Sequence, residues 1–422
     1  MNDSGQAQTR RAVSAAVIGN VLEWYDFAVY GYVATFIATN LFPPGNETKA
    51  LLATFLTFGI GFLARPLGGI VIGWVGDKYG RKTALLITIF LMAVGTVIIG
   101  LIPTYAAIGV LAPAILVIAR LMQGFSAGGE WGGSTAFIVE WAPANRRGYY
   151  GSFQQMSVVL GLLLGSGTAA LLNTVLDAGT MESWGWRIPF LLGGILGPVG
   201  LWMRRTIDET PAFRRAAAKP LVSDDRFSSP LILAMQAFGF TILWTVSFYI
   251  FLAYMPTFTQ RYAGLGRAAA LWSNTAGLLL LMLAIPLFGH LSDKYGRKPF
   301  LLSCCLAFIV LPYPLFSLML GGASLTTILL IQLLIGLTIA LFSGAGPAAI
   351  SEIFPTRTRS TYMSTGYALA VAIFGGFAPF IATWLIDWTK SPVSPVYYVI
   401  AAAIVSTIVI APLRETAHEP LG

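Results

Sequence analysis

The stretch Gly73–Lys82, with the sequence GWVGDKYGRK, separates two long apolar runs and returns as Gly289–Lys298, GHLSDKYGRK. The second copy begins 216 residues after the first (289 − 73), about half of the 422-residue chain. A second pair, Glu140–Arg147 and Glu352–Arg359, recurs at an interval of 212 residues (352 − 140). Two sequence motifs that recur in the same order at nearly the same interval indicate a duplicated unit. The sequence therefore predicts one protein built from two similar halves.

The composition is that of a chain that lies mostly in lipid. Hydrophobic residues make up 56% of it and charged residues only 10%, whereas soluble domains carry about 25% charged residues. Apolar runs of about 20 residues recur, long enough to cross a hydrocarbon core of about 30 Å. We predict an all-α membrane protein. Its net charge of +8 comes from basic residues in short gaps between apolar runs, where orientation signals are expected, so nucleic acid is not an expected partner.

The apolar runs between polar or Pro/Gly breaks predict twelve transmembrane spans. They cover residues 12–39, 50–75, 83–102, 108–138, 148–172, 188–203, 230–256, 268–291, 299–320, 325–350, 360–386 and 393–412. The first run contains Glu23 and Asp26 and is too long and too polar for a signal peptide, so we expect it to be retained as a span. The long polar connection at 204–229 predicts a linker between an N-terminal bundle, 1–203, and a C-terminal bundle, 230–422.

The distribution of basic residues predicts the orientation. Of the 26 Lys and Arg residues, 19 fall in segments that are cytoplasmic if the N-terminus is inside, five in the opposite segments and two within spans. Basic residues favour the cytoplasmic side of a membrane. We therefore expect both termini, and the 204–229 linker, in the cytoplasm.

Four further stretches accompany the repeated motif, and together they resemble a known family. They are Gly19–Phe27 (GNVLEWYDF), Gly61–Gly69 (GFLARPLGG), Gln123–Glu130 (QGFSAGGE) and Trp184–Phe190 (WGWRIPF). With these stretches the chain resembles the major facilitator superfamily, and within it the metabolite:proton symporters, which include proline/betaine, α-ketoglutarate, citrate and shikimate transporters. The resemblance implies twelve helices in two pseudo-symmetric six-helix bundles around a central cavity that opens alternately to each side.

The resemblance also implies a proton as the coupling ion, no cofactor, and a multi-pass protein in the inner (plasma) membrane of a bacterium; we expect a monomer. An enzyme is not expected, because one histidine, His290, lies at the edge of the eighth span and the other, His418, in the C-terminal tail, and no Cys/His spacing suits a metal such as zinc.

Ionisable residues inside a membrane are costly and mark candidate functional sites. Arg120 lies about midway along the fourth span, and its counterpart in the second half is the neutral Gln332. A charge needed only for the scaffold should appear in both halves. The planar guanidinium suits a carboxylate, to which it donates two parallel hydrogen bonds. Arg120 is thus a candidate for substrate binding; the alternative is an internal ion pair with a carboxylate of the first span.

Glu23 and Asp26 are three residues apart and so share one face of the first helix. Burial in an apolar surrounding and mutual repulsion both favour the protonated form of a carboxyl group. Because neither histidine lies deep within a span, a proton pathway there must use carboxylates. We predict Asp26 as the proton-coupling residue, followed by Glu23. The alternative is a permanent ion pair with Arg65 of the second span, for which the resemblance implies a substrate or coupling contact.

A second set of charged residues lies near the cytoplasmic ends of the spans. By the family pattern, Glu130 should pair with Arg81 of the repeated motif, with Asp77 nearby, and such a cluster would hold the inside closed. The same interpretation covers the corresponding residues Glu140, Arg147, Asp293, Arg297, Glu352 and Arg359. We predict gating roles for them; the alternative is simple anchoring at the inner surface.

Polar and aromatic residues within the spans are further candidates for substrate contact: Tyr25, Tyr30, Gln154, Gln155, Tyr249 and Gln332. Tyrosines in spans are often interface residues, whereas an amide in mid-bundle needs a partner. Glycines of the fifth span, Gly161, Gly165 and Gly167, remove bulk so that helices can approach closely.

Two substrate classes fit these residues. The first is a small organic anion, such as a di- or tricarboxylate, imported with protons and held by Arg120 and Arg65. The second is a zwitterion such as proline or glycine betaine, whose ammonium group would bind to aromatic faces; the candidates are Trp24, Tyr25, Trp131 and Trp244. The C-terminal Arg414–Ala417 also resembles the proline/betaine branch. A drug exporter is less expected, because the fifth span lacks the proline of the exporter motif.

Overall fold

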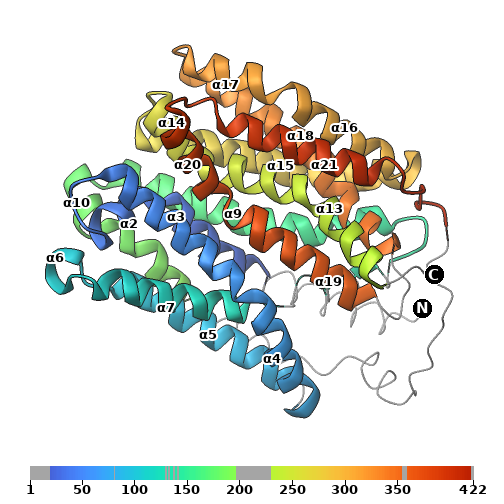
Figure 1. The fold of residues 1–422 in the computed structure, drawn as a ribbon, viewed down its shortest axis with the longest axis horizontal. Helices are drawn as coiled ribbons and strands as arrows, with labels where there is room; N and C mark the ends of the chain where they lie inside the picture. Colours follow the sequence, from blue (N-terminus) through green and yellow to red (C-terminus); the bar gives the residue numbers. More distant parts are fainter. Residues whose placement is uncertain are drawn as a thin grey trace.

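The computed structural model describes residues 20–79, 81–128, 131, 134–135, 138–139, 142–195, 230–353 and 359–419. Within these ranges the regular structure is entirely helical (Figure 1). Within the described residues, each of the twelve predicted spans contains a helix or consecutive helices. The predicted all-α architecture is confirmed. The predicted linker at 204–229 lies outside the described residues.

The helices of the first half follow the first six predicted spans. They are a helix over 20–32 with α2 (Ala34–Leu41), α3 (Glu47–Leu63) with α4 (Arg65–Tyr79), α5 (Arg81–Leu101), α7 (Leu111–Ser126), α9 (Arg147–Val175) and a helix over 188–195. Short helical turns α6 (Tyr105–Ile108), α10 (Ala178–Ser183) and η1 (Gly185–Arg187) lie between them.

The second half repeats this plan. Its helices are α13 (Pro230–Phe248) with η2 (Tyr249–Tyr254) and α14 (Met255–Tyr262), α15 (Arg267–Tyr295), α16 (Lys298–Val310) with α17 (Pro312–Leu320), α18 (Leu325–Ile353), α19 (Arg359–Ala370) with η3 (Val371–Gly375) and α20 (Ala378–Thr389), and α21 (Pro395–Ile410). The segments η2 and η3 are π-helical turns.

Prolines mark the points where a new helical segment begins within several spans. Pro66, Pro256, Pro312 and Pro379 each occupy the first or second position of a new helix. A proline is tolerated there because the N–H that it lacks would have no partner in the first turn. At Pro312 the axes of α16 and α17 are bent by 44°. The span of α16 and α17 is therefore bent, whereas residues 47–72, 232–262 and 363–389 each run as one long helix past their proline.

Six of the described helices are long and apolar enough to cross a membrane, and a seventh appears if the bent α16–α17 pair counts as one span. The shorter apolar helices 86–101, 111–126 and 395–410 occupy three further predicted spans. Large hydrophobic side chains such as Ile70, Val110 and Ile408 are exposed on the outside of the bundle. Such a surface suits lipid rather than water.

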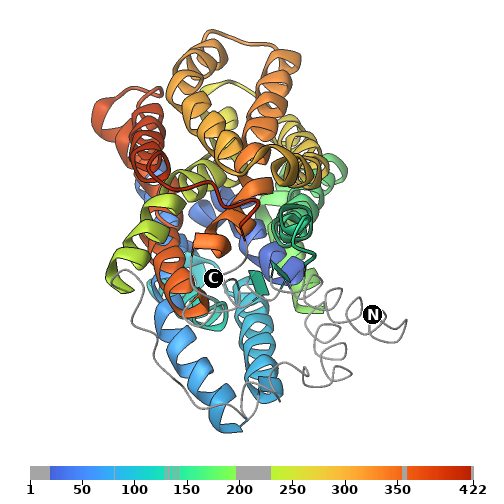
Figure 2. The same ribbon diagram turned by 90° about the vertical axis from the view of Figure 1, so that its right-hand side faces the viewer.

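The two halves of the chain meet mainly along α9 and α3. Helix α9 packs along α15 and α18, and α3 packs against η3 and α20. Figures 1 and 2 show first-half helices (blue to green) on one side and second-half helices (yellow to red) on the other, with α9 at the boundary. We call the end of the bundle at which α4, α15 and α18 terminate the motif end, since the repeated stretches lie there.

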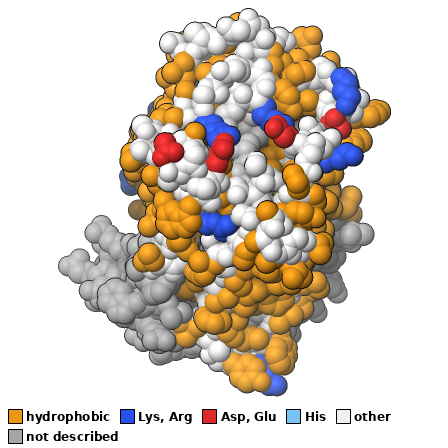
Figure 3. Space-filling model, turned by 90° about the vertical axis from the view of Figure 1, so that its left-hand side faces the viewer, with side chains coloured by type: hydrophobic (Ala, Val, Ile, Leu, Met, Phe, Trp, Pro, Cys, Tyr) orange, Lys and Arg blue, Asp and Glu red, His pale blue; other side chains and the backbone are white. Residues whose placement is uncertain are grey.

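Charged side chains gather at the opposite end of the bundle (Figure 3). Three ion pairs lie there, Arg261–Glu47 at 3.2 Å, Arg267–Glu182 at 2.9 Å and Lys390–Asp387 at 2.9 Å. The first two join the second half to the first. All three have exposed partners, so each contributes only about 0–1 kcal/mol.

Glycines permit the close approach of α9 to its neighbours. A Cβ at Gly148 would lie 2.5 Å from the carbonyl oxygen of Gly289 on α15. A Cβ at Gly161 would lie 2.6 Å from the carbonyl oxygen of Val21. At Gly167, by contrast, the nearest atom to an added Cβ is 4.0 Å away. Close approach therefore requires glycine at 148 and 161 but not at 167.

We expect Gly161→Ala to destabilise the protein by about 1–3 kcal/mol, because the new methyl group must push the first helix away from α9. Gly167→Ala is the matched control on the same helix. It should be neutral or slightly stabilising, since glycine inside a helix costs about 0.5–1 kcal/mol relative to alanine. Thermal unfolding of the purified protein in detergent measures both. Equal melting temperatures for the two variants would contradict the packing argument.

Candidate functional site

Arg120 lies at the centre of the first half. Its side chain comes from α7 and has no exposed surface. The guanidinium carbon lies 4.5 Å from the ring centre of Tyr30 and 4.9 Å from those of Phe27 and Phe58. Nη1 donates to Oε1 of Gln123 at 2.9 Å. Aromatic faces and an amide oxygen thus surround the charge, and Nε has no hydrogen-bond partner.

Asp26 lies close to Arg120 but does not form a direct ion pair with it among the described contacts. Its Oδ2 accepts a hydrogen bond from Thr96 Oγ1 at 2.8 Å. That hydroxyl oxygen in turn accepts a hydrogen bond from Gln123 Nε2 at 2.8 Å. Oδ1 of Asp26 has no hydrogen-bond partner. The expected alternative, an internal pair between Arg120 and a first-span carboxylate, is therefore replaced by a chain of hydrogen bonds.

Arg65 is the first residue of α4, and its side chain is 6% exposed. Its Nη2 lies 3.7 Å from Oε1 of Glu23, which is an ion pair but too long for a hydrogen bond. The guanidinium lies 4.5 Å from the ring centre of Phe62 and 4.7 Å from that of Phe27. Nε and Nη2 have no hydrogen-bond partner. Arg65 thus keeps donors that could hold a carboxylate, and it is paired with Glu23, not with Asp26.

A small cavity of about 10 Å³ lies between the halves, with room for about one water molecule. Trp24 and Gln155 line it from the first half. The second half contributes Thr241, Trp244, Thr245, Phe248, Tyr249 and Tyr367. Tyr249 packs on Phe62, with ring centres 5.3 Å apart, and Phe62 lies under Arg65. The cavity is therefore an aromatic space beside a guanidinium group.

Three polar atoms of the cavity wall lack hydrogen-bond partners: Gln155 Oε1, Thr245 Oγ1 and the hydroxyl of Tyr249. All three residues are at most 4% exposed. Buried polar atoms are normally paired, because an unpaired one costs about 1–3 kcal/mol. The adjacent Gln154 is also buried, and its amide oxygen and nitrogen have no partner. These groups are available to a ligand.

Other candidates from the sequence have local partners. The hydroxyl of Tyr25 donates to the carbonyl of Pro189 at 3.0 Å, and that of Tyr30 to the carbonyl of Thr54 at 2.9 Å. Gln332 lines a separate cavity of about 10 Å³ in the second half, together with Asn274. Its Nε2 donates to Ser273 at 2.9 Å. The structure thus does not bring Gln332 to the aromatic cavity.

An aromatic stack joins the halves next to the cavity. Trp131 and Tyr367 lie parallel, with ring centres 3.6 Å apart and planes 3° from parallel. Trp244 meets Trp131 edge-on at 5.8 Å. Sequence reasoning considered Trp131 and Trp244 only as possible cation-binding faces and did not place Tyr367. Periodicity alone cannot reveal a stack between residues 236 positions apart (367 − 131).

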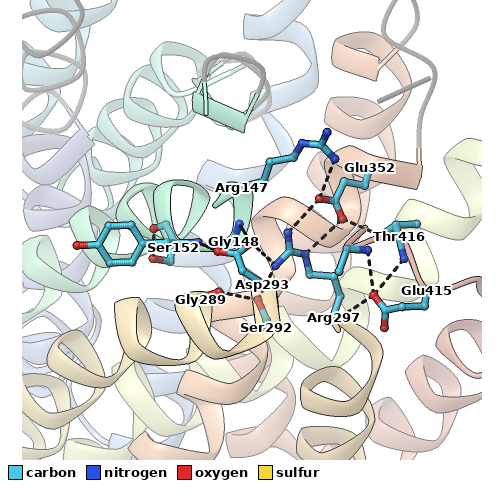
Figure 4. Close-up of polar contacts among 12 residues, drawn as sticks. Arg147, Gly148, Ser152, Gly289, Ser292, Asp293, Arg297, Glu352, Glu415 and Thr416 are labelled. Carbon is cyan, nitrogen blue, oxygen red and sulfur yellow. Dashed lines mark hydrogen bonds and ion pairs between the residues drawn. The ribbon is translucent and has the colours of Figure 1, made fainter. Parts of the chain in front are cut away.

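A buried ion cluster lies at the motif end (Figure 4). Arg297, at the start of α16, pairs with Asp293 at 2.8 Å and with Glu352 at 3.1 Å. Arg147 of α9 lies 3.6 Å from Glu352. Burial alone would lower the pKa of Arg297, but the charges and hydrogen bonds of Glu352 and Asp293 outweigh it and raise that pKa. We call these four residues the Arg297 cluster.

The Arg297 cluster joins the two halves through backbone amides. The carboxylate of Asp293 accepts hydrogen bonds from the backbone N–H groups of Gly148 and Tyr149, both at 2.8 Å. These are first-turn residues of α9, whose N–H groups have no partner within the helix. A negative charge is also favoured at a helix N-terminus. Asp293 thus caps α9 from the other half of the chain.

The segment after α21 completes this contact. Glu415 accepts hydrogen bonds from the backbone N–H groups of Arg297 at 2.8 Å and Lys298 at 3.0 Å. Thr416 donates to Glu352 at 2.7 Å, and Arg147 donates to the backbone carbonyl of Glu419 at 2.9 Å. Burial opposes ionisation of Glu415, but these backbone hydrogen bonds outweigh it and lower its pKa. The sequence contained no signal for this role of Glu415.

Several predicted gating residues cannot be placed in this network. Glu130 and Glu140 lie outside the described residues. Asp77, Arg81 and Arg359 belong to α4, α5 and α19, but their side chains also lie outside the described part.

Comparisons with known proteins agree with this architecture. The family model "Sugar (and other) transporter" matches residues 12–226, and the model "Major Facilitator Superfamily" matches residues 264–421. The proline/betaine transporter of Escherichia coli K12 is 34% identical over 98% of this chain and 85% of its own length. The citrate-proton symporter of Klebsiella pneumoniae is 36% identical over 93% of this chain and 89% of its own length.

A solved structure of the proton:xylose symporter XylE has the same fold, with a TM-score of 0.80 and 19% identity over 99% of this chain and 98% of that one. At that identity the likeness concerns the fold alone. The family models and the relatives above 30% identity carry the assignment. The chain is therefore a membrane transporter rather than an enzyme, and it belongs to the major facilitator superfamily.

Proposed function

We propose that this protein imports a small zwitterion, carrying one carboxylate and one quaternary or secondary ammonium group, together with protons. Proline and glycine betaine have this chemistry. The observation that carries the proposal is the aromatic cavity between the halves, lined by five aromatic rings with Arg65 close by. Relatives named as proline/betaine transporters at 33–36% identity support the same substrate class.

The aromatic rings suit the cationic end of such a substrate. Trp24, Trp244, Phe248, Tyr249 and Tyr367 line the cavity, and among the described residues no acidic or basic side chain does so. A quaternary ammonium group offers no hydrogen-bond donor and is bound through the faces of aromatic rings. Such a cation keeps its charge when it loses its water on binding. The aromatic faces take the place of that water.

The carboxylate end would bind to an arginine. Arg65 has two buried nitrogens without hydrogen-bond partners, and a carboxylate can accept two parallel bonds from one guanidinium. Arg120 would contribute positive potential from behind Tyr30 and Phe58, on which it stacks. Gln155 and Tyr249 would supply the remaining polar contacts to the substrate.

A di- or tricarboxylate is the second candidate. The 36% identical citrate-proton symporter favours it, and two guanidinium groups near the cavity are compatible with it. A tricarboxylate, however, carries up to three negative charges that must lose water together. Among the described residues that line the cavity, none supplies a further cation to offset that cost, so we place the zwitterion first.

Asp26 and Glu23 are the proposed proton-coupling residues. Asp26 Oδ1 is buried and has no hydrogen-bond partner, so it can receive a proton without displacing a donor. Glu23 is within ion-pair distance of Arg65. A substrate carboxylate that binds to Arg65 would therefore compete with Glu23 for the same guanidinium.

The Arg297 cluster is the proposed gate at the motif end, which we place in the cytoplasm of a bacterial cell together with both termini. Opening this end must separate α9 from α15 and so break the bonds from Gly148 and Tyr149 to Asp293. We further propose that residues 1–203 and 230–422 move as two units joined by 204–229. Asp77, Arg81, Glu130, Glu140 and Arg359 remain proposed members of the gate.

The charge on the substrate can be tested with an isostere pair. Glycine betaine should raise the melting temperature of the purified protein, whereas 3,3-dimethylbutanoate, in which carbon replaces the quaternary nitrogen, should bind about tenfold more weakly. The difference follows from a cation–π contribution of about 0.5–2 kcal/mol. Because only a ligand that prefers the folded state stabilises it, proline, citrate, tricarballylate, succinate, α-ketoglutarate and shikimate complete the panel.

Trp24→Leu should abolish the difference between the two isosteres, and Trp388→Leu is its matched control. Trp388 is 70% exposed on the outside of the bundle and cannot touch the cavity. Stabilisation by citrate but not by betaine or proline would make the anion the substrate class instead. Arg120→Gln measures whether that guanidinium contributes to binding at all.

Asp293→Asn should destabilise the closed motif end by about 3–5 kcal/mol, because it leaves a buried arginine without part of its countercharge. Asp387→Asn, in an exposed pair with Lys390, is the control and should change stability by less than about 1 kcal/mol. A cysteine introduced as Ser152→Cys, buried between α9 and α15, reports opening through its rate of reaction with a water-soluble maleimide. Equal labelling in both backgrounds would refute the gate.

Glu415→Gln should lower stability at neutral pH. A carboxyl group whose pKa is lowered on folding stabilises above its unfolded value, 4.5 here, and loses that contribution as the pH falls through the folded value. The gap in melting temperature between wild type and Glu415→Gln should therefore close on acidification below about pH 4.5. Glu419→Gln is the control, since only the backbone carbonyl of Glu419 contacts the cluster. A gap that persists unchanged at low pH would exclude the ionised carboxylate as its cause.

A further inference from the structure

Two uncharged side chains connect the carboxyl group of Asp26 with the guanidinium of Arg120. Arg120 Nη1 donates to Gln123 Oε1 at 2.9 Å, Gln123 Nε2 donates to Thr96 Oγ1 at 2.8 Å, and Thr96 Oγ1 lies 2.8 Å from Asp26 Oδ2. We propose that Thr96 and Gln123 are positioning residues that couple the protonation of Asp26 to Arg120. The inference rests on the proposed function in one respect, the role of Asp26 as proton carrier.

The direction of this hydrogen-bond chain is set at the arginine. A guanidinium can only donate hydrogen bonds, so the amide oxygen of Gln123 must face Arg120. The amide nitrogen then faces Thr96 and must donate to its hydroxyl oxygen. With that lone pair occupied, the single hydroxyl proton of Thr96 is directed onward. Arg120 thus determines the hydrogen bond that Asp26 receives, although the two side chains form no direct pair.

Thr96 has two alternative acceptors for its proton. Its hydroxyl oxygen lies 2.8 Å from Asp26 Oδ2 and 2.9 Å from the backbone carbonyl of Met92 on its own helix. When Asp26 is ionised, the hydroxyl can donate to the carboxylate. When Asp26 is protonated, the acid can donate to Thr96, whose own proton turns to Met92. In both states the hydroxyl of Thr96 keeps a donor and an acceptor as partners, so proton uptake reverses one bond without leaving Thr96 unsatisfied.

Few other described groups lie near enough to Asp26 to act on the protonation of its carboxyl group. Among the described residues, Arg120 and Tyr25 are the charged or titratable groups that act on its carboxyl group. From α5 it meets Thr96, and from the helix over 188–195 it meets Gly193, where an added Cβ would collide with Oδ1. Asp26 is 5% exposed and Gln123 and Thr96 are buried. Bulk water therefore does not take the place of Thr96 or Gln123 in the hydrogen-bond chain.

The relay predicts that a change at Gln123 alters Asp26 without touching it. In the full-length protein reconstituted in lipid, the infrared carboxyl band that disappears in Asp26→Asn reports the protonation of Asp26 as the pH is varied. Thr96→Val removes the donor, and Gln123→Met removes the group that orients it. Each should shift the midpoint of the band to higher pH by about one unit, because the bond from Thr96 to the ionised carboxylate is charge-assisted and stronger than the bond in the protonated form, so its loss or weakening costs the ionised form more. Thr96→Ser should restore the wild-type midpoint.

Thr338→Val is the matched control. Thr338 is a buried helical threonine whose hydroxyl donates to the carbonyl of Leu334, so its loss should leave the midpoint unchanged. An unchanged midpoint in Gln123→Met, or an Asp26 band that does not titrate, would overturn the relay. If Thr96→Ser failed to restore the midpoint, shape rather than the hydroxyl would be responsible, and the relay would again be refuted.

Transport by the same variants separates this inference from the substrate proposal. With an inward proton gradient, wild-type vesicles should accumulate glycine betaine or proline, and Thr96→Val should reduce uphill accumulation about tenfold while exchange of internal for external substrate continues. Failure of the wild type to accumulate either compound would reject the proposed substrate class. The infrared shift in Gln123→Met would still decide the relay, since that measurement contains no substrate.

Discussion

The burial of two guanidinium groups within one six-helix half is the constraint on which the central part of the structure depends. A charge at this depth has no water to stabilise it, and a direct carboxylate partner would neutralise it permanently. Arg120 has no direct carboxylate partner among the described contacts, and the pair of Arg65 with Glu23 is 3.7 Å long. The faces of Phe27, Tyr30, Phe58 and Phe62 surround the two guanidinium groups. Aromatic quadrupoles lower the cost of the charge without using up all of its hydrogen-bond donors. Phe58 and Phe62 pack on Tyr249, which lines the cavity. One aromatic cluster therefore both stabilises the buried arginines and forms part of the cavity wall.

The scaffold around this centre combines close contact with local breaks. Glycines let α9 approach α15 and the first helix to backbone distance, where side chains larger than hydrogen do not fit. Prolines begin new helical segments within other spans, and π-helical turns at η2 and η3 lie beside the cavity. Such turns are frequent at functional sites. Rigid contacts therefore lie along the boundary between the halves, and the joints lie within individual spans near the substrate space.

The fold could be predicted from the sequence because its signals are local: the length of apolar runs, the asymmetry of basic residues and a repeated ten-residue motif. The depth of Arg120, Arg65 and Asp26 was predictable for the same reason, and all three are buried. Their partners were not. Thr96 and Gln123 meet only because α5 packs on α7, and neither residue type distinguishes a relay from an ordinary helix residue. Internal symmetry matches Gln332 to Arg120, but its side chain donates to Ser273 and lines another cavity, so its role in substrate binding stays a prediction.

The attachment of Glu415 and Glu419 to helices made much earlier has a consequence for biosynthesis. A membrane protein is inserted from its N-terminus as it is synthesised, so α9 and α15 can meet while the last span is still in the ribosome. The bonds from Arg297 and Lys298 to Glu415, and from Arg147 to Glu419, can form only after synthesis has passed residue 419. Until then the amides at the start of α16 and the Arg147 guanidinium lack these partners. Final closure of this end is therefore a late step of assembly, which waits for the segment that follows α21.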